Sequence, residues 1–202
     1  SGGRIVSYAT LTPVGFPPYS ISGTVTNASG AGLAGITVYF SATPNASTNP
    51  AGFTVTDPSG NYVMPIVNGT WYAAAGSSNF IPSADQVAVM NSANVTNVNF
   101  GLLAKPKASG TVTDLAGVPI GGAKVWFSLT PDAGANPAYT ATTDASGNYT
   151  QVVDTATLYI AAGASNYFVS ADRVLVVSGP VTGVDFALAQ LPPRNVPQSG
   201  QL

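Results

Sequence analysis

The sequence predicts an all-β protein made of two tandem seven-stranded antiparallel β-sandwiches with Greek-key connections. Three observations predict this fold class. The chain repeats itself once, each copy contains short runs in which apolar and polar residues alternate, and Gly, Pro, Asn or Asp interrupts the chain between the runs. Short strands separated by turn residues at a spacing of roughly 8–12 residues are typical of a sandwich, and no segment keeps the period of a long helix.

The repeat has an offset of 87 residues, so that SGTVT at 22–26 returns at 109–113. Aligned without a gap, residues 21–90 and 108–177 are identical at 34 of 70 positions. We therefore divide the chain into four parts: a strand-forming extension with a proline-rich connector (1–20), a first module (21–104), a second module (105–188) and a proline-rich tail (189–202).

Alternation within each copy predicts the strands. Ile36, Val38 and Phe40 alternate with three residues of the opposite face, Tyr39 among them, and this period of two indicates a half-buried strand. The expected strands of the first copy are 21–26, 36–41, 52–56, 61–66, 70–75, 86–90 and 95–101, with equivalents in the second copy.

The clearest predicted turns are the matching segments 56–62 and 143–149. Asp57 and Asp144 are expected to bind their own backbone, while Gly60 and Gly147 supply the positive φ that closes each turn. A calcium loop would need more carboxylates than either segment contains. We therefore interpret both segments as structural turns.

Composition excludes most function classes. Only 7% of the 202 residues are charged, against about 25% in a typical domain, and the chain contains neither His nor Cys. The usual ligands of zinc, haem and iron–sulfur clusters are therefore missing, as are Ser–His–Asp and Cys–His catalytic groups. Six basic residues cannot supply the phosphate contacts of a nucleic-acid-binding protein, and no apolar run is long enough to span a membrane. Asp85 and Asp172 stand in matching contexts but lack the second carboxylate of an acid–base pair. We expect no enzyme, no cofactor and no metal.

The motifs resemble those of the carboxypeptidase regulatory-like domain. They are SGTVT at 22–26, AGLAG at 31–35, TDPSGNY at 56–62 and GTWY at 69–72, with counterparts in the second copy, and the resemblance covers about residues 21–188. This family is similar to transthyretin and to the collagen-adhesin B-type repeats, which implies a prealbumin-like sandwich. Its members serve as spacers, adhesin stalks, sugar-binding accessories or fibre units, so the fold alone does not decide the function.

The collagen-adhesin resemblance implies a second feature, a Lys–Asn isopeptide bond, for which Lys124 is the candidate. Its counterpart in the first copy is Thr37, and the alternation places Lys124 on the outer face of its strand beside Trp126. We therefore predict a solvated lysine that interrupts an exposed sheet face.

Two sets of residues are candidates for contact or binding. Tyr39 and Trp126 occupy the same outward position in the two copies, where an aromatic ring could stack on a sugar, anchor an interface or pack across strands. The strand 70–75, which contains Trp71, and its counterpart with Leu158 and Ile160 are apolar on both faces. A strand buried on one face should alternate, so we expect the second face to meet the sister module, another chain or a covering loop.

The extension contains a β-prone segment, 4–12, outside the repeat. Ile5, Val6, Tyr8 and Leu11 are its apolar members. A lone strand is unstable in water, so this segment is expected to add to a sheet edge of its own first module or of a neighbouring subunit.

Together these features predict a non-catalytic extracellular structural protein, a subunit or segment of a surface fibre, filament or adhesive stalk that self-associates through sheet edges and apolar faces. Low charge suits such a setting, because cytosolic proteins rely on charge for solubility. The expected partners are copies of the chain or other modules of a larger surface protein, with polysaccharide as a further candidate. The alternative is a spacer or carbohydrate-binding accessory region of a secreted multimodular enzyme.

Overall fold

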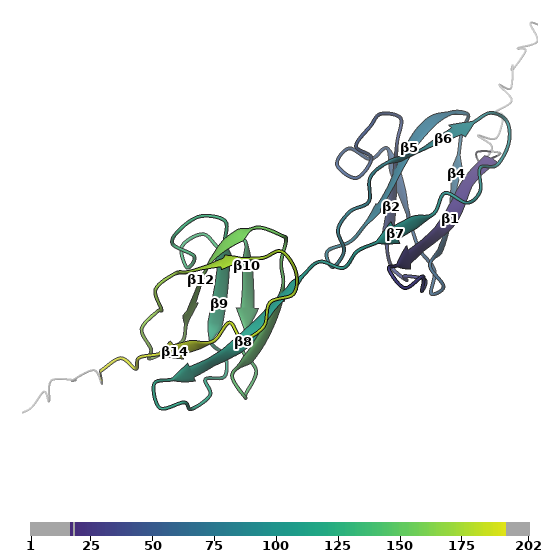
Figure 1. The fold of residues 1–202 in the computed structure, drawn as a ribbon. Helices are drawn as coiled ribbons and strands as arrows, with labels where there is room; N and C mark the ends of the chain where they lie inside the picture. The colour runs from purple at the N-terminus through teal and green to yellow at the C-terminus, as the bar shows by residue number, and fades with distance from the viewer. Residues whose placement is uncertain (1–16, 18, 193–202) are drawn as a thin grey trace, which may run out of the picture. The chain divides into compact units, whose positions relative to one another are not determined.

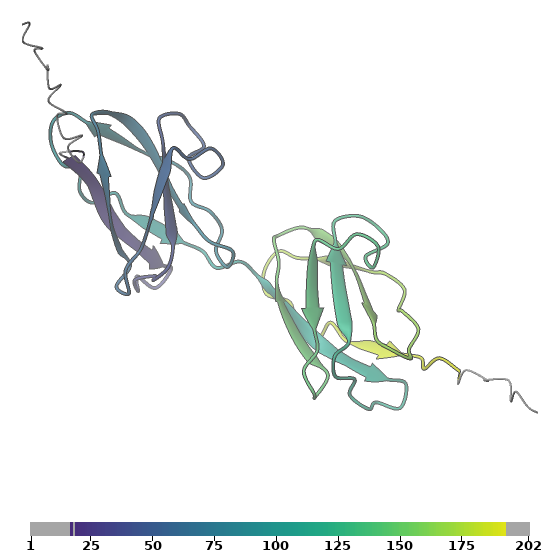
Figure 2. The same cartoon turned by 180° about the vertical axis from the view of Figure 1, so that it is seen from behind.

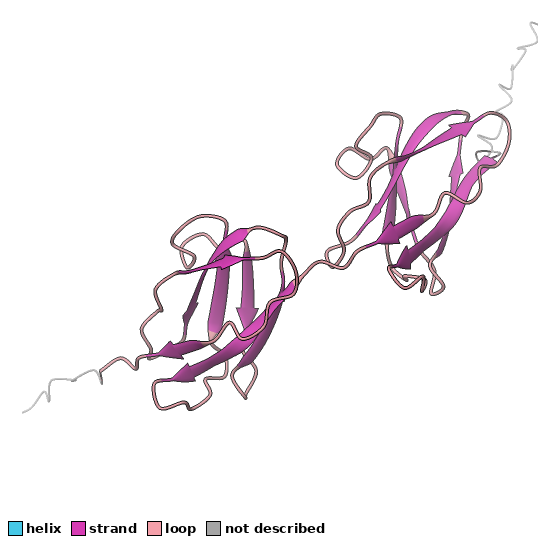
Figure 3. Cartoon of the chain, viewed as in Figure 1, coloured by secondary structure: helices cyan, strands magenta, loops and turns pink. Residues whose placement is uncertain are grey.

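The computed structural model describes residue 17 and residues 19–192. All regular elements among them are β-strands (Figure 3). The chain divides into two compact units between Ala104 and Lys105. This part of the chain contains no helix with the length and apolarity needed to cross a bilayer. The predicted all-β class with two sandwiches is confirmed.

The first module contains seven strands in two sheets (Figure 1). The strands are β1 (Tyr19–Asn27), β2 (Thr37–Ser41), β3 (Gly52–Val55), β4 (Asn61–Ile66), β5 (Gly69–Gly76), β6 (Gln86–Met90) and β7 (Phe100–Leu102). Their order is β4-β1-β7 in the three-stranded sheet and β3-β2-β5-β6 in the four-stranded sheet.

The second module repeats this arrangement with seven further strands. They are β8 (Lys107–Asp114), β9 (Lys124–Ser128), β10 (Tyr139–Thr142), β11 (Asn148–Val152), β12 (Thr157–Gly163), β13 (Arg173–Val176) and β14 (Phe186–Leu188). The sheet orders are β11-β8-β14 and β10-β9-β12-β13.

The core of each module lies between its two sheets. Val38 and Phe40 of β2 are fully buried there, whereas Tyr39 between them faces outward and pairs with Phe53 of β3 and Ala74 of β5. The alternation in the sequence thus separates an inner face from an outer face, because successive side chains of a strand point to opposite sides.

A buried tyrosine on β4 is hydrogen-bonded to the segment that precedes β7. The Tyr62 hydroxyl donates a 2.6 Å hydrogen bond to the carbonyl oxygen of Val98, and its ring packs 6.1 Å from the ring of Phe40. Tyr149 donates an equal bond to Val184 in the second module. Burial raises the pKa of both hydroxyls well above the ordinary value, so they remain protonated donors.

The sheets are not purely antiparallel, which corrects one detail of the predicted fold. β1 and β7 pair in parallel, as do β8 and β14. Figures 1 and 2 show from opposite sides that the arrows of each such pair point the same way. The chain therefore enters each module at one end, the entry pole, and leaves it at the opposite end, the exit pole, because the first and last strands run in the same direction.

The last strand of the first module is shorter than the predicted 95–101. Val95 makes an isolated bridge to Ile21, and the strand β7 begins only at Phe100. Between them Asn97 has φ of 63°, a left-handed conformation that interrupts extended pairing.

Candidate interaction surface

The outer face of each four-stranded sheet carries the matched aromatic residues. Tyr39 on β2 and Trp126 on β9 point outward, and both are partly buried. The indole of Trp126 lies so close to the backbone of β12 that a Cβ atom on Gly163 would be 2.8 Å from it. It also lies beside Gly134 of the β9–β10 loop. The ring therefore rests on small residues that leave room for it.

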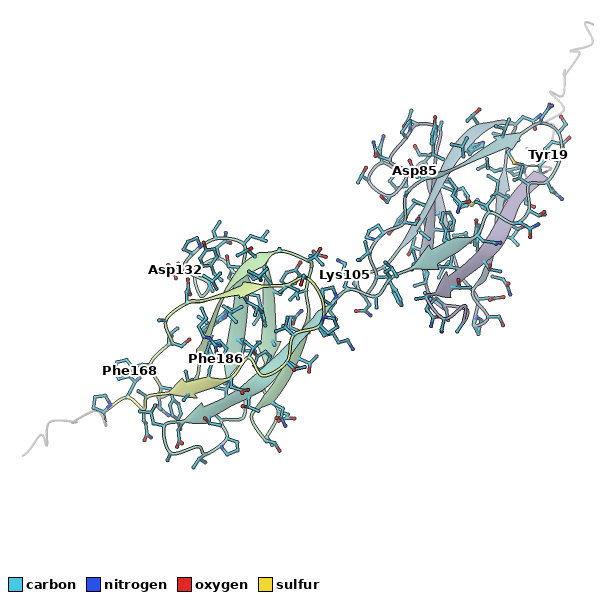
Figure 4. All side chains as sticks on the ribbon, viewed as in Figure 1. Tyr19, Asp85, Lys105, Asp132, Phe168 and Phe186 are labelled. Carbon is cyan, nitrogen blue, oxygen red and sulfur yellow. The ribbon has the colours of Figure 1, made fainter. Side chains whose placement is uncertain are left out.

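A loop covers part of this face in the first module. Asp85, which Figure 4 labels, directly precedes β6. Its carboxylate accepts hydrogen bonds from the backbone N–H groups of Asn45 (2.5 Å) and Ala46 (3.1 Å) in the β2–β3 loop. These bonds draw the loop across β5, whose outward Ala74 is completely buried. Asn45 accommodates the turn with φ of 69°.

The second module builds the same cover. Asp172 accepts hydrogen bonds from the backbone N–H groups of Asp132 (2.6 Å) and Ala133 (3.2 Å), and outward Ala161 is 1% exposed. A covering loop is thus one reason why β5 and β12 are apolar on both faces. Asp85 and Asp172 anchor these loops, which gives each carboxylate a structural role.

Three of the predicted contact residues face the core instead of the outer surface. Leu158 and Ile160 are 0% and 1% exposed and belong to the core of the second module, while Trp71 packs against the core of the first. Trp71 also donates a 3.1 Å hydrogen bond from Nε1 to the Val67 carbonyl. Both faces of these strands read as apolar, so the alternation could not say which face is inside. The outward aromatic position is Tyr72, repeated as Tyr159.

The predicted turns are closed by their aspartates. Asp57 Oδ1 accepts hydrogen bonds from the N–H groups of Ser59 (2.9 Å) and Asn61 (2.8 Å), and Gly60 has φ of +83°. The bond from the Asn61 backbone is the main cause that lowers the pKa of Asp57. Asp144 makes the same bonds at 2.9 Å each, and Gly147 has φ of +75°. Among the described residues, no three acidic side chains lie close enough together to hold a metal ion.

A shallow cavity of about 230 Å³ opens beside Trp126. Lys124 and Ser165 supply its polar side chains, and Val169 is a further apolar lining residue. Lys124 is exposed and its ammonium donates a 2.6 Å hydrogen bond to Thr142 Oγ1 on the adjacent strand.

The edge strands β6 and β13 expose apolar side chains that the sequence analysis did not single out. Val87 and Val89 of β6 are 59% and 62% exposed, and their counterparts Val174 and Val176 of β13 are 63% and 68% exposed. All four lie on the outer face of the sheet, since Val87 pairs with Tyr72 and Val174 with Tyr159. The signal was present in the run QVAVM at 86–90, which is apolar on both faces like the strand 70–75.

These edges carry little charge. β6 contains no charged residue. The one charged residue of β13, Arg173, is exposed, and its guanidinium donates a 2.6 Å hydrogen bond to the Asp185 carbonyl and lies 5.4 Å from the ring of Phe186. Natural sheet edges are usually protected by lysines, prolines or bulges, so the exposed valines of these two edges make them candidates for a contact surface. The candidate added strand with Ile5, Val6, Tyr8 and Leu11 lies outside the described residues.

The family resemblance is confirmed for the first module. Residues 20–103 match the sequence profile of the carboxypeptidase regulatory-like domain. The second module shares the fold and the repeat. No curated protein sequence matches the chain.

Several solved structures are similar to the chain. The shaft pilin SpaA from Lactobacillus rhamnosus GG is 13% identical with a TM-score of 0.51, over 91% of this chain and 99% of that one. A streptococcal ancillary pilin is 13% identical with a TM-score of 0.47, over 87% of this chain and 63% of that one. The Bacillus anthracis TIE protein is 9% identical with a TM-score of 0.37, over 85% of this chain and 34% of that one. The chain thus spans about a third of the TIE protein and somewhat less than two thirds of the ancillary pilin.

Proposed function

We propose that this protein is a non-catalytic structural subunit or segment of an extracellular surface fibre, filament or adhesive stalk. The observation that carries the proposal is the path of the chain through each module, which enters at the start of β1 or β8 and leaves at the end of the parallel neighbour β7 or β14. Modules entered and left at opposite poles suit a linear string. The fold shared with a shaft pilin and the scarcity of charge support the same function.

Self-association through sheet edges is the finer part of the proposal. Residues 4–12 of one chain would add as a strand to β6 or β13 of a neighbouring chain, where the exposed valines give an apolar outer face and the backbone edge gives hydrogen bonds. Both faces of the donated segment contain apolar residues, with Ile5 and Leu11 on one and Val6 and Tyr8 on the other. It can therefore pack on both sides of the edge it extends.

Deletion of residues 1–12 tests this arrangement. If the strand is donated between chains, sedimentation should show loss of assembly while both modules still unfold cooperatively. Deletion of residues 193–202 serves as the control and should leave assembly unchanged. Loss of first-module stability without any change of oligomeric state would show internal pairing and would refute donation.

Charge placed on the edge tests the acceptor. V87K combined with V174K should block assembly, because each lysine would lie beside the added strand. V63K is the matched control, since Val63 is 57% exposed on the edge strand β4 of the other sheet. Equal effects of the two variants would show that β6 and β13 are not the acceptors.

Carbohydrate binding is a second candidate function, favoured by the cavity beside Trp126. Its aromatic ring, Lys124 ammonium and Ser165 hydroxyl combine an apolar plane with hydrogen-bonding groups, as sugar sites do. Titration of soluble cell-wall oligosaccharides into the W71F variant would report on Trp126 fluorescence alone. A saturable change that is absent from the W71F/K124A variant would support this function, and a flat titration would exclude it for those sugars.

A further inference from the structure

The first and last strands of each module form a parallel pair that continues beyond the regular ladder. In the first module Val25 pairs with Phe100 and Asn27 with Leu102. Nearer the entry pole, Ser22 donates from its N–H to the Val95 carbonyl (2.9 Å) and accepts from the Val98 N–H (3.1 Å). The backbone contact therefore extends along most of β1.

Side chains strengthen this pair at the same place in both modules. Asn99 Oδ1 accepts hydrogen bonds from the Thr24 N–H (2.9 Å) and hydroxyl (3.1 Å). Asp185 Oδ1 accepts the equivalent bonds from Thr111 at 2.7 and 2.9 Å. Asn99 and Asp185 directly precede β7 and β14, so these bonds join the paired strands just before the regular ladder begins.

The pair is also backed by the core. Ile21 and Val25 of β1 are 0% exposed, and Leu102 of β7 is 1% exposed. Water therefore has little access to the inner side of the β1–β7 contact, and the hydrogen bonds there are not readily exchanged for bonds to solvent.

We propose that the β1–β7 and β8–β14 pairs are shear clamps that allow each module to bear tension along the chain. A pull applied through the chain acts at the start of β1 and at the end of β7, which are opposite ends of a parallel pair. The hydrogen bonds lie across the direction of pull and share the load, so they must break together. A pair pulled from one common end would instead open one bond at a time. Resistance to forced unfolding depends on the rate of crossing this barrier.

This inference goes beyond assembly, because it concerns a single chain. A fibre subunit would use the property, yet a chain that never polymerises would still show it. Measurements on isolated tethered molecules therefore test the clamp independently of the proposed function.

Single-molecule force spectroscopy on two cysteine pairs tests the clamp, and the absence of native cysteine makes the attachment specific. P17C with L103C loads the first module from opposite poles. S29C with L103C loads it from the exit pole alone, since the turn after Asn27 lies beside the end of β7. All three substituted side chains are at least partly exposed. At equal pulling speed we expect a severalfold lower unfolding force for S29C/L103C, with equal thermal stability of both variants.

The extension on unfolding identifies the module. In the P17C/L103C geometry, the 84 residues from Tyr19 to Leu102 correspond to about 300 Å of extended chain, less the folded end-to-end distance. N99A should lower the unfolding force more in the P17C/L103C geometry than in the S29C/L103C geometry. Equal forces in the two geometries would overturn the proposal, as would an N99A effect that does not depend on geometry.

Discussion

Removal of the Tyr62 hydroxyl should destabilise the first module and leave the second unchanged. Tyr62→Phe keeps the ring that packs between Phe40 and Phe100, so the apolar core is preserved. It removes the 2.6 Å hydrogen bond to the Val98 carbonyl, which is packed so tightly that a Cβ atom on Gly23 would lie 2.0 Å from its oxygen. The substitution therefore leaves a confined acceptor without this donor.

The expected loss of unfolding free energy is about 2 kcal/mol, since an unsatisfied buried polar group costs roughly 1–3 kcal/mol. For a domain of this size that corresponds to a fall of about 8–16 °C in the Tm of the first module. Differential scanning calorimetry measures both modules in one experiment. Tyr149→Phe should produce the same change in the other transition, because Tyr149 makes the equivalent bond.

Tyr72→Phe is the matched control, because Tyr72 lies on the outer face of β5 and is partly exposed. It should change the Tm little. Equal shifts for Tyr62→Phe and Tyr72→Phe would refute the reasoning, because the buried bond would then contribute no more than a surface hydroxyl.

Three further predictions concern other parts of the chain. Intact-protein mass spectrometry should show no loss of ammonia, because Lys124 is exposed and bonded to a threonine; such a loss would establish an isopeptide bond. Asp154 forms a 2.8 Å ion pair with Lys105, and this contact is the first cause that lowers the pKa of Asp154. The stabilisation that the ion pair provides is therefore present above the ordinary pKa of 3.8 and is lost as pH falls through the lowered value. Since Asp154 is 54% exposed, acid should reduce the stability of the second module by less than about 1 kcal/mol relative to D154N, and an equal acid response of the two proteins would contradict this. Gly110→Ala should destabilise the second module by about 1–3 kcal/mol, because the added Cβ would lie 2.1 Å from a carbonyl oxygen, whereas Gly179→Ala has open space and should be neutral; similar melting of both would be the contrary result.

Much of the fold could be predicted because burial leaves a period of two in the sequence. Val38 and Phe40 against Tyr39 identify the inner and outer faces of β2 without any knowledge of its neighbours. The direction of pairing leaves no such mark, so the parallel partnership of β1 and β7 had to come from the structure. The end of the extended segment at Asn97 was also hidden, since asparagine is compatible with several conformations.

The candidate surface was harder to predict. Asp85 binds backbone N–H groups 39 and 40 residues away, and such donors are present at nearly every position of any sequence. The loop over Ala74 could therefore not be predicted, although its consequence, a strand that is apolar on both faces, was visible in the sequence. The same ambiguity made Trp71, Leu158 and Ile160 contact candidates, although all three face the core. Whether Val87 is exposed depends on β6 being an edge, which is a property of sheet order.

Electron cryomicroscopy of the assembled native material would test the central claim most directly. The account predicts filaments in which density for residues 4–12 of one subunit lies as an added strand along β6 or β13 of the next. Single particles of one chain at high concentration, with residues 4–12 protected from hydrogen exchange, would contradict it.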